Sequence, residues 1–80
     1  MQVKILGSGC TNCKNLERKV INLLAEHNID ADVVKVAEIA DIMAYGIMRT
    51  PGLVINEVVK SAGVIPKDDQ ILAWLKEARS

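Results

Sequence analysis

The feature that most constrains this chain is a pair of cysteines in the stretch Gly7-Ser8-Gly9-Cys10-Thr11-Asn12-Cys13-Lys14, which follows a short apolar run. A strand is expected to end here and a helix to begin. The start of a helix offers unpaired backbone N–H groups and the positive end of the helix dipole, and both stabilise a thiolate. The thiolate is the form of cysteine that attacks disulfides and binds soft metals. The stretch therefore predicts a reactive dithiol at a strand–helix junction.

The composition narrows the class of protein. A chain of 80 residues is predicted to form a single domain over residues 1–80, and its core must be aliphatic because half of it is hydrophobic while Phe is absent. Ten basic residues balance ten acidic ones without a basic block, which argues against a nucleic-acid or anionic-membrane partner. No apolar run approaches the roughly 20 residues of a membrane span, and the first residues lack the apolar region of a signal peptide. We expect a cytoplasmic protein. In that reducing compartment, two cysteines are more often catalytic or metal-binding than joined in a structural disulfide.

The first half of the chain predicts a strand, a helix and a second strand. The strand covers Gln2 to Leu6, the helix runs from Thr11 to His27 and the second strand covers Asp30 to Val36. The helix has a single apolar stripe, made by Cys13, Leu16, Val20, Leu23 and Leu24. Cys13 is therefore expected to point inward, while Cys10 lies at the open end of the helix. A right-handed crossover with parallel strands is expected for this unit, with Asn28 closing the helix in a left-handed turn.

The second half predicts a short helix, a β-hairpin and a last helix. Their ranges are Glu38 to Tyr45, Leu53 to Ile55 with Val58 to Ala62, and Lys67 to Ala78. In the short helix the helical period places Ile39, Ile42 and Met43 inward, and Gly46 stops it. The last helix has four residues available for packing, Ile71, Leu72, Trp74 and Leu75. The full order is β-α-β-α-β-β-α.

This order, with Cys-x-x-Cys at the first helix and Thr50-Pro51 just before the third strand, resembles the thioredoxin and glutaredoxin family. The likeness is greatest to its very small redox proteins from archaea and bacteria. It covers nearly the whole chain, and its matching points are Gly7 to Lys14, Tyr45-Gly46-Ile47, Thr50 to Ile55 and Ala62 to Pro66. The resemblance implies an α/β, thioredoxin-like fold of glutaredoxin size, with a four-stranded mixed sheet flanked by helices.

The resemblance also implies a thiol–disulfide oxidoreductase, an electron carrier that reduces or exchanges protein disulfides and serves cell redox homeostasis. Cys10 would be the nucleophile, and Cys13, one helical turn on, would resolve the mixed disulfide. The redox-active disulfide Cys10–Cys13 would be the only redox group, with no cofactor and no metal. The partners implied are disulfide-containing protein substrates and an upstream reductase, and we expect a monomer.

Five further positions complete the expected site. Lys14, Thr11 and Asn12 would tune the nucleophile, although Lys14 could equally be a solvated lysine on an exposed helix face. In the family the proline at Pro51 is cis and packs beside the disulfide. The backbone of the preceding residue, here Thr50, would pair with the substrate chain as in β-augmentation.

Several residues depart from the family pattern. Thr11-Asn12 replaces the Gly-Pro of thioredoxins and the Pro-Tyr of glutaredoxins, which leaves the direction of electron flow open. Lys4 stands where thioredoxins carry a buried acid. The glutathione-binding pattern of glutaredoxins is poorly matched, with Asp68 or Asp69 the nearest acidic group.

Two other functions are compatible with the cysteine pair. One is a small metallochaperone of ferredoxin-like fold, in which the two thiolates hold Cu(I) or Zn(II). That family usually carries Met where this chain has Ser8, and it ends on a strand rather than on a helix containing Trp74. The other is a thioredoxin-like interaction domain without catalysis, which the retention of both cysteines disfavours.

Three more residues are of types that can serve in catalysis or metal binding, but simpler structural roles are expected for them. His27, about four helical turns from Cys10, is expected to be a surface residue favoured by the helix dipole rather than a catalytic base. Met43 and Met48 are expected to fill gaps in the core rather than to bind copper.

Overall fold

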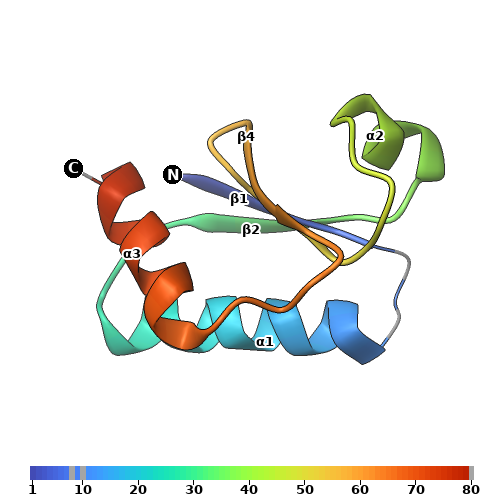
Figure 1. Ribbon diagram of the computed structural model, residues 1–80. Helices are drawn as coiled ribbons and strands as arrows, with labels where there is room; N and C mark the ends of the chain where they lie inside the picture. Colours follow the sequence, from blue (N-terminus) through green and yellow to red (C-terminus); the bar gives the residue numbers. More distant parts are fainter. Residues whose placement is uncertain (8, 10, 80) are drawn as a thin grey trace.

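The computed structural model describes residues 1–7, 9 and 11–79 of the chain. Its elements follow the predicted order (Figure 1). They are β1 (Gln2–Leu6), α1 (Thr11–Glu26), β2 (Asp32–Val36), α2 (Ile39–Ala44), β3 (Gly52–Ile55), β4 (Val58–Ala62) and α3 (Asp68–Arg79). The predicted ranges differ from these by one or two residues at some ends. No helix in the described part of the chain is long and apolar enough to span a membrane.

The four strands form one mixed sheet in the order β2-β1-β3-β4. β1 is parallel to β2 and antiparallel to β3, and β3 is antiparallel to β4. The parallel pair follows from α1, because a crossover helix returns the chain to the end of the sheet where it started. This arrangement confirms the thioredoxin-like α/β fold class.

The helices cover both faces of the sheet: α1 and α3 lie on one face and α2 lies over the other (Figure 1). Side chains alternate along a strand, so β1 directs Val3 and Ile5 to the α1 side and Leu6 to the α2 side. The larger core lies between the sheet, α1 and α3, with Leu16, Val20, Leu53, Ile55, Ile71 and Leu75 among its buried members. The smaller core, on the α2 side, contains Leu6, Ile42, Ile47 and Val54.

The short helix α2 differs from its predicted orientation. Ile42 is buried as expected, but the side chains of Ile39 and Met43 are 70% and 66% exposed. The helix has six residues, fewer than two turns, so its contact with the sheet is made by one side chain rather than by a stripe. The inward placement of Ile39 and Met43 was therefore wrong, and Met48, which is 98% exposed, does not fill a gap in the core as expected.

The predicted turns adopt the expected backbone. Asn28 has a φ of 51° just after α1, and Gly46 has a φ of 79° just after α2. Both are in the left-handed region that commonly ends a helix. The β3–β4 hairpin turns through Asn56 and Glu57, which have φ values of 50° and 67° and match the twist of the flanking strands.

Candidate active site

The first turn of α1 contains Cys13, the second cysteine of the predicted motif. Cys13 is buried, with 5% of its surface exposed, and it is disulfide-bonded. It lies on the buried stripe of α1, as the helical period predicts. Thr11, Asn12 and Lys14 are exposed around it. Cys10, the predicted nucleophile, lies outside the described residues, so its role stays a prediction.

The end of β1 brings the motif next to the start of β3. Leu6 pairs with Gly52, so Gly7 follows directly at the edge where Thr50 and Pro51 enter the sheet. A Cβ added at Gly7 would overlap the sulfur of Cys13 and lie 3.7 Å from the Cβ of Thr50. Cys13 and Thr50 therefore flank one backbone position, although they are far apart in the sequence. The absence of a side chain at Gly7 is what permits this approach.

The segment before β3 combines a buried proline with an exposed backbone. Pro51 is fully buried, Thr50 is exposed, and the peptide bond between them is cis. The carbonyl oxygen of Pro51 accepts a hydrogen bond from the backbone N–H of Gly63, at 2.8 Å. Within the described residues, no hydrogen-bond partner meets the backbone of Thr50. Thr50 thus offers unpaired backbone groups beside Cys13.

Two lysines line the same small cavity as Cys13. A cavity of about 20 Å³ is lined by Ile5, Gly7, Gly9, Cys13, Lys14 and Lys35. Lys14 was predicted to tune the site, whereas Lys35 was missed. Lys35 belongs to β2 and pairs with Ile5, so only the register of the parallel strands places it here. Its Nζ also contacts Glu17 Oε1 at 3.3 Å, which ties it to α1.

Lys4 has no part in this cavity, because it points to the α2 side of the sheet. Its Nζ donates hydrogen bonds to Glu57 Oε1 and Tyr45 Oη, both at 2.6 Å, and lies 5.4 Å from the centre of the Tyr45 ring. The hydrogen bond with Glu57, followed by that with Tyr45, raises the pKa of Lys4 above 10.5. The same bond with Lys4 lowers the pKa of Glu57 below 4.5. The β1 side chain that does line the Cys13 cavity is Ile5.

The remaining predicted candidates lie elsewhere. His27 is exposed just beyond the C-terminal end of α1, as expected for a surface histidine. Asp68 forms an ion pair with Lys19 at 3.1 Å, and Trp74 packs against the larger core. The part of the chain described here contains no group of three or more His, Cys, Asp or Glu side chains placed to hold a metal ion.

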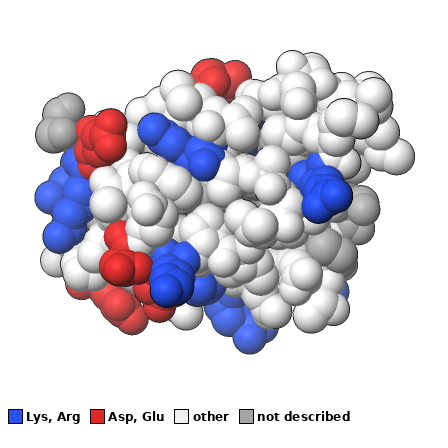
Figure 2. Space-filling model, in the orientation of Figure 1, with Lys and Arg blue, Asp and Glu red and all other residues white. Residues whose placement is uncertain are grey.

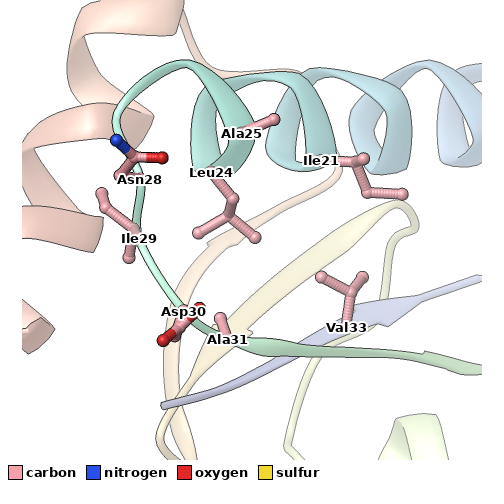
Figure 3. A pocket seen from close by; sticks show the side chains of 8 residues that line it. All are labelled: Ile21, Leu24, Ala25, Asn28, Ile29, Asp30, Ala31 and Val33. Carbon is pink, nitrogen blue, oxygen red and sulfur yellow. The ribbon is translucent and has the colours of Figure 1, made fainter.

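A more spacious pocket lies at the other end of α1. It has a volume of about 580 Å³ and lies between the C-terminal half of α1 and the segment that leads into β2 (Figure 3). Ile21 and Leu24 reach it from the helix, and Ala31 and Val33 from the strand side. It contains no thiol and lies more than two helical turns from Cys13 along the helix, so size alone does not identify the reactive site.

The comparisons with known proteins agree with the fold. Residues 1–76 match the family described as "Thioredoxin domain". The chain is 32% identical over 71 residues to the thioredoxin of Methanothermobacter thermautotrophicus, covering 89% of this chain and 92% of that protein. It is also 32% identical over 74 residues to the thioredoxin of Methanocaldococcus jannaschii, covering 92% of this chain and 85% of that protein. At the level of the family these matches support a thiol–disulfide oxidoreductase, and they do not favour a metallochaperone. The chain belongs to the thioredoxin family.

Proposed function

We propose that the protein is a thiol–disulfide oxidoreductase that reduces or exchanges disulfides in other proteins, with Cys10 as nucleophile and Cys13 as resolving thiol. The observation that carries the proposal is the position of Gly7, which lets the sulfur of Cys13 and the Cβ of Thr50 flank the same point. Among the described residues, no hydrogen bond occupies the backbone of Thr50. A substrate chain paired with Thr50 would place its own disulfide at the start of α1.

The proposed reaction is two successive thiol–disulfide exchanges. The Cys10 thiolate attacks one sulfur of the substrate disulfide. That bond breaks, a mixed disulfide forms, and the first substrate thiolate leaves and takes up a proton from water. The Cys13 thiolate then attacks the Cys10 sulfur and releases the second substrate thiolate. The substrate gains two electrons, and the protein is left with the Cys10–Cys13 disulfide, which an upstream reductase must reduce.

Two lysines lie near the proposed resolving thiol. Lys14 and Lys35 line the same small cavity as Cys13, and a positive charge near a cysteine favours its thiolate form. Thr11 and Asn12 are exposed between the cysteines, where they can adjust the approach of the substrate. We infer that the protein works in the cytoplasm as a monomer, with no cofactor besides the disulfide.

The test uses one serine variant of each cysteine. Cys10→Ser is expected to abolish the reduction of a protein disulfide such as that of insulin, because no sulfur attacks. Cys13→Ser is expected to trap a covalent mixed disulfide with the substrate, visible by mass spectrometry and released by dithiothreitol. Equal residual turnover in both variants, or trapping by Cys10→Ser instead, would contradict the assigned roles.

The reduction potential of the metal-free protein decides the direction of electron flow. Equilibration in thiol redox buffers should give one reversible two-electron couple. A value near about −270 mV indicates a reductant, and one near about −120 to −180 mV an exchanger or oxidant. If the cysteines form no disulfide and instead retain Zn(II) or Cu(I) through gel filtration, the redox function is wrong.

A further inference from the structure

The charges of α1 are arranged against the stability of the helix. It has no acidic residue in its first turn and no basic residue in its last turn, whereas α3 begins with two acidic residues and ends with two basic ones. Only the arrangement in α3 suits the helix dipole, whose positive end is the N-terminus. In α1 the basic side chains of Lys14 and Arg18 also lie four residues apart on one face, where like charges repel each other. Helix stability therefore does not explain these two cations.

Four cations lie around the small cavity that Cys13 lines. Lys14 and Lys35 line the cavity itself. Arg18 follows Lys14 by about one helical turn, and Arg49 comes one residue before the cis peptide bond. All four side chains belong to exposed residues. We call these four residues, Lys14, Arg18, Lys35 and Arg49, the basic rim.

Most of the basic rim is free to meet a partner. Of its four cations, Lys35 forms an ion pair, with Glu17 at 3.3 Å, and the described residues provide no carboxylate partner for the other three. Arg49 is positioned by packing, because a Cβ added at Gly63 would lie 2.8 Å from the Cβ of Arg49. The acidic residues Glu38 and Asp41 belong to the N-cap and first turn of α2, on the other face of the sheet from α1.

The two ends of the molecule differ in charge, although its formal net charge is zero. Figure 2 shows basic atoms and no acidic ones among the described residues at its right end, where α1 begins in Figure 1. Acidic atoms gather toward the left end of this face. The far end of α1 and the chain that follows it carry Glu26, Asp30 and Asp32. A molecule with this asymmetry directs its positive end toward a partner that approaches the cysteine motif.

We propose that the basic rim binds carboxylate side chains that flank the disulfide of a protein substrate, so that acidic substrates are preferred. This inference rests on the proposed function and names its substrate class. A substrate chain that pairs with the backbone of Thr50 passes beside Arg49, and its alternate residues lie about 7 Å apart on one side. Carboxylates on the two sides of the substrate cysteine can thus meet Arg49 on one flank and Lys14 or Arg18 on the other.

A role of the basic rim in thiol chemistry alone makes a different prediction. Cations that only stabilise a thiolate change the rate for every substrate alike. Cations that bind the substrate produce an effect that depends on the charge of the substrate and on salt. Arg18 and Arg49 separate the two cases, because neither lines the cavity of Cys13.

The first test compares three disulfide-bonded peptides that differ only in the two residues flanking the cysteine, which are Glu, Gln or Lys. At low ionic strength, wild-type protein should show a kcat/KM about tenfold higher for the Glu peptide than for the Gln peptide, with the Lys peptide slowest. Raising the salt from about 20 mM to about 500 mM should bring the three values within about twofold of each other. Equal values at low salt, a preference for the Lys peptide, or a preference that salt does not weaken would overturn the proposal.

Variants then assign the preference to the basic rim. Arg18→Gln combined with Arg49→Gln should bring the ratio of the Glu to the Gln peptide to about two or less. The control Lys76→Gln combined with Arg79→Gln removes the same charge from the last turn of α3, at the opposite end of the molecule, and should keep the ratio. Arg18→Gln alone should not lower the midpoint of urea unfolding, because it breaks no ion pair. An equal loss in the control would mean that net charge rather than the basic rim sets the preference.

Binding measured without catalysis distinguishes failure of this proposal from failure of the oxidoreductase function. Peptides with Ser in place of the cysteine are titrated into ¹⁵N-labelled protein. The Glu peptide is expected to shift the amide signals of Lys14, Arg18 and Arg49, and the Lys peptide to shift none. If wild-type protein reduces neither the peptides nor insulin while these signals move, the oxidoreductase function fails and the binding stands. If all three peptides are reduced equally and no signal moves, the substrate preference is wrong while the activity stands.

Discussion

At the scale of single residues, the smallest side chains decide what can meet at the candidate site. Gly7 is not needed for an unusual φ, since only Gly9, Gly46 and Gly63 among the glycines have positive values. Its importance is steric, because the space of a Cβ is taken by the sulfur of Cys13. The sequence shows the glycine but not its contact, which depends on how α1 lies against the end of β1.

Replacing Gly7 by Ala should therefore be costly only while Cys13 keeps its sulfur. We expect Gly7→Ala to lower the free energy of unfolding by about 1–3 kcal/mol, because an added methyl overpacks the site. In a Cys13→Ala background the cost should shrink, which gives a coupling of about 1 kcal/mol or more in a double-mutant cycle. Denaturant unfolding with dithiothreitol present keeps all four proteins reduced. If the effects of Gly7→Ala and Cys13→Ala on the free energy of unfolding are strictly additive, the added methyl group does not clash with the Cys13 sulfur.

Lys35 is the residue that sequence reasoning passed over, and its charge makes a second prediction at this scale. Lys35→Met should slow the resolution of the mixed disulfide by about two- to threefold near neutral pH, because its positive charge favours the Cys13 thiolate but is weakened by solvent and by the ion pair with Glu17. The rate profile of that step should move to higher pH. Stopped-flow measurement separates it from the first attack.

Two controls distinguish charge from packing at Lys35. Lys35→Arg should restore the rate, because it keeps the positive charge at the cavity. Lys76→Met, the same substitution in the last turn of α3, should change nothing. A loss that Lys35→Arg fails to rescue would indicate a purely structural role.

At the scale of elements, the Lys4 contacts join three parts of the fold. Lys4 is in β1, Tyr45 follows α2, and Glu57 is in the turn between β3 and β4. Glu57 adopts a φ of 67° in this turn, a conformation that Gly accepts more easily. Its side chain compensates, since it binds both Lys4 and Tyr45. The turn was predictable from the sequence, but this contact joins distant positions and was not.

This contact predicts a pH dependence of stability. The pKa of Glu57 is lowered in the folded protein, so its contribution is complete above about 4.5 and is lost as the pH falls through the folded value. The pKa of Lys4 is raised, so its contribution is complete below about 10.5 and is lost as the pH rises through the folded value. The difference in unfolding free energy between wild type and Glu57→Gln should therefore be level between these limits and decline outside them. If this difference does not change with pH, the protonation of Glu57 and Lys4 is not coupled to folding.

The elements themselves show where sequence patterns suffice. The stripe of α1 runs through four turns, and its members Leu16, Val20 and Leu23 are buried as predicted. In α2 the same rule failed for Ile39 and Met43, because six residues define no face and the short helix touches the sheet through Ile42. Both misplaced side chains are exposed and line a pocket that Thr50 also lines.

At the scale of the whole molecule, the sheet divides the protein into two unequal cores. The α1 and α3 side buries most of the large side chains, whereas the α2 side holds Leu6, Ile42, Ile47 and Val54. The family resemblance implied a mixed sheet flanked by helices, and the structure confirms it. The unequal burial could not be read from the sequence, because it depends on how much of α2 contacts the sheet. The candidate site lies where the two cores meet, at the end of β1.

The last prediction concerns how this division governs opening of the structure. We expect the amides of Tyr45 and Gly46, which donate to Ile42 and Met43, to exchange through local opening at a lower free energy than the amides in the middle of α1. Ile42→Ala should lower their protection first. Leu16→Ala should lower the global stability by about 2–5 kcal/mol and with it the protection of α1. Hydrogen exchange followed by NMR in low denaturant measures both effects. Because Ile42 is the α2 residue that is buried in the smaller core, α2 can open without unfolding the larger core between the sheet and α1. Equal opening free energies for α2 and α1 would mean instead that the two cores unfold as one cooperative unit.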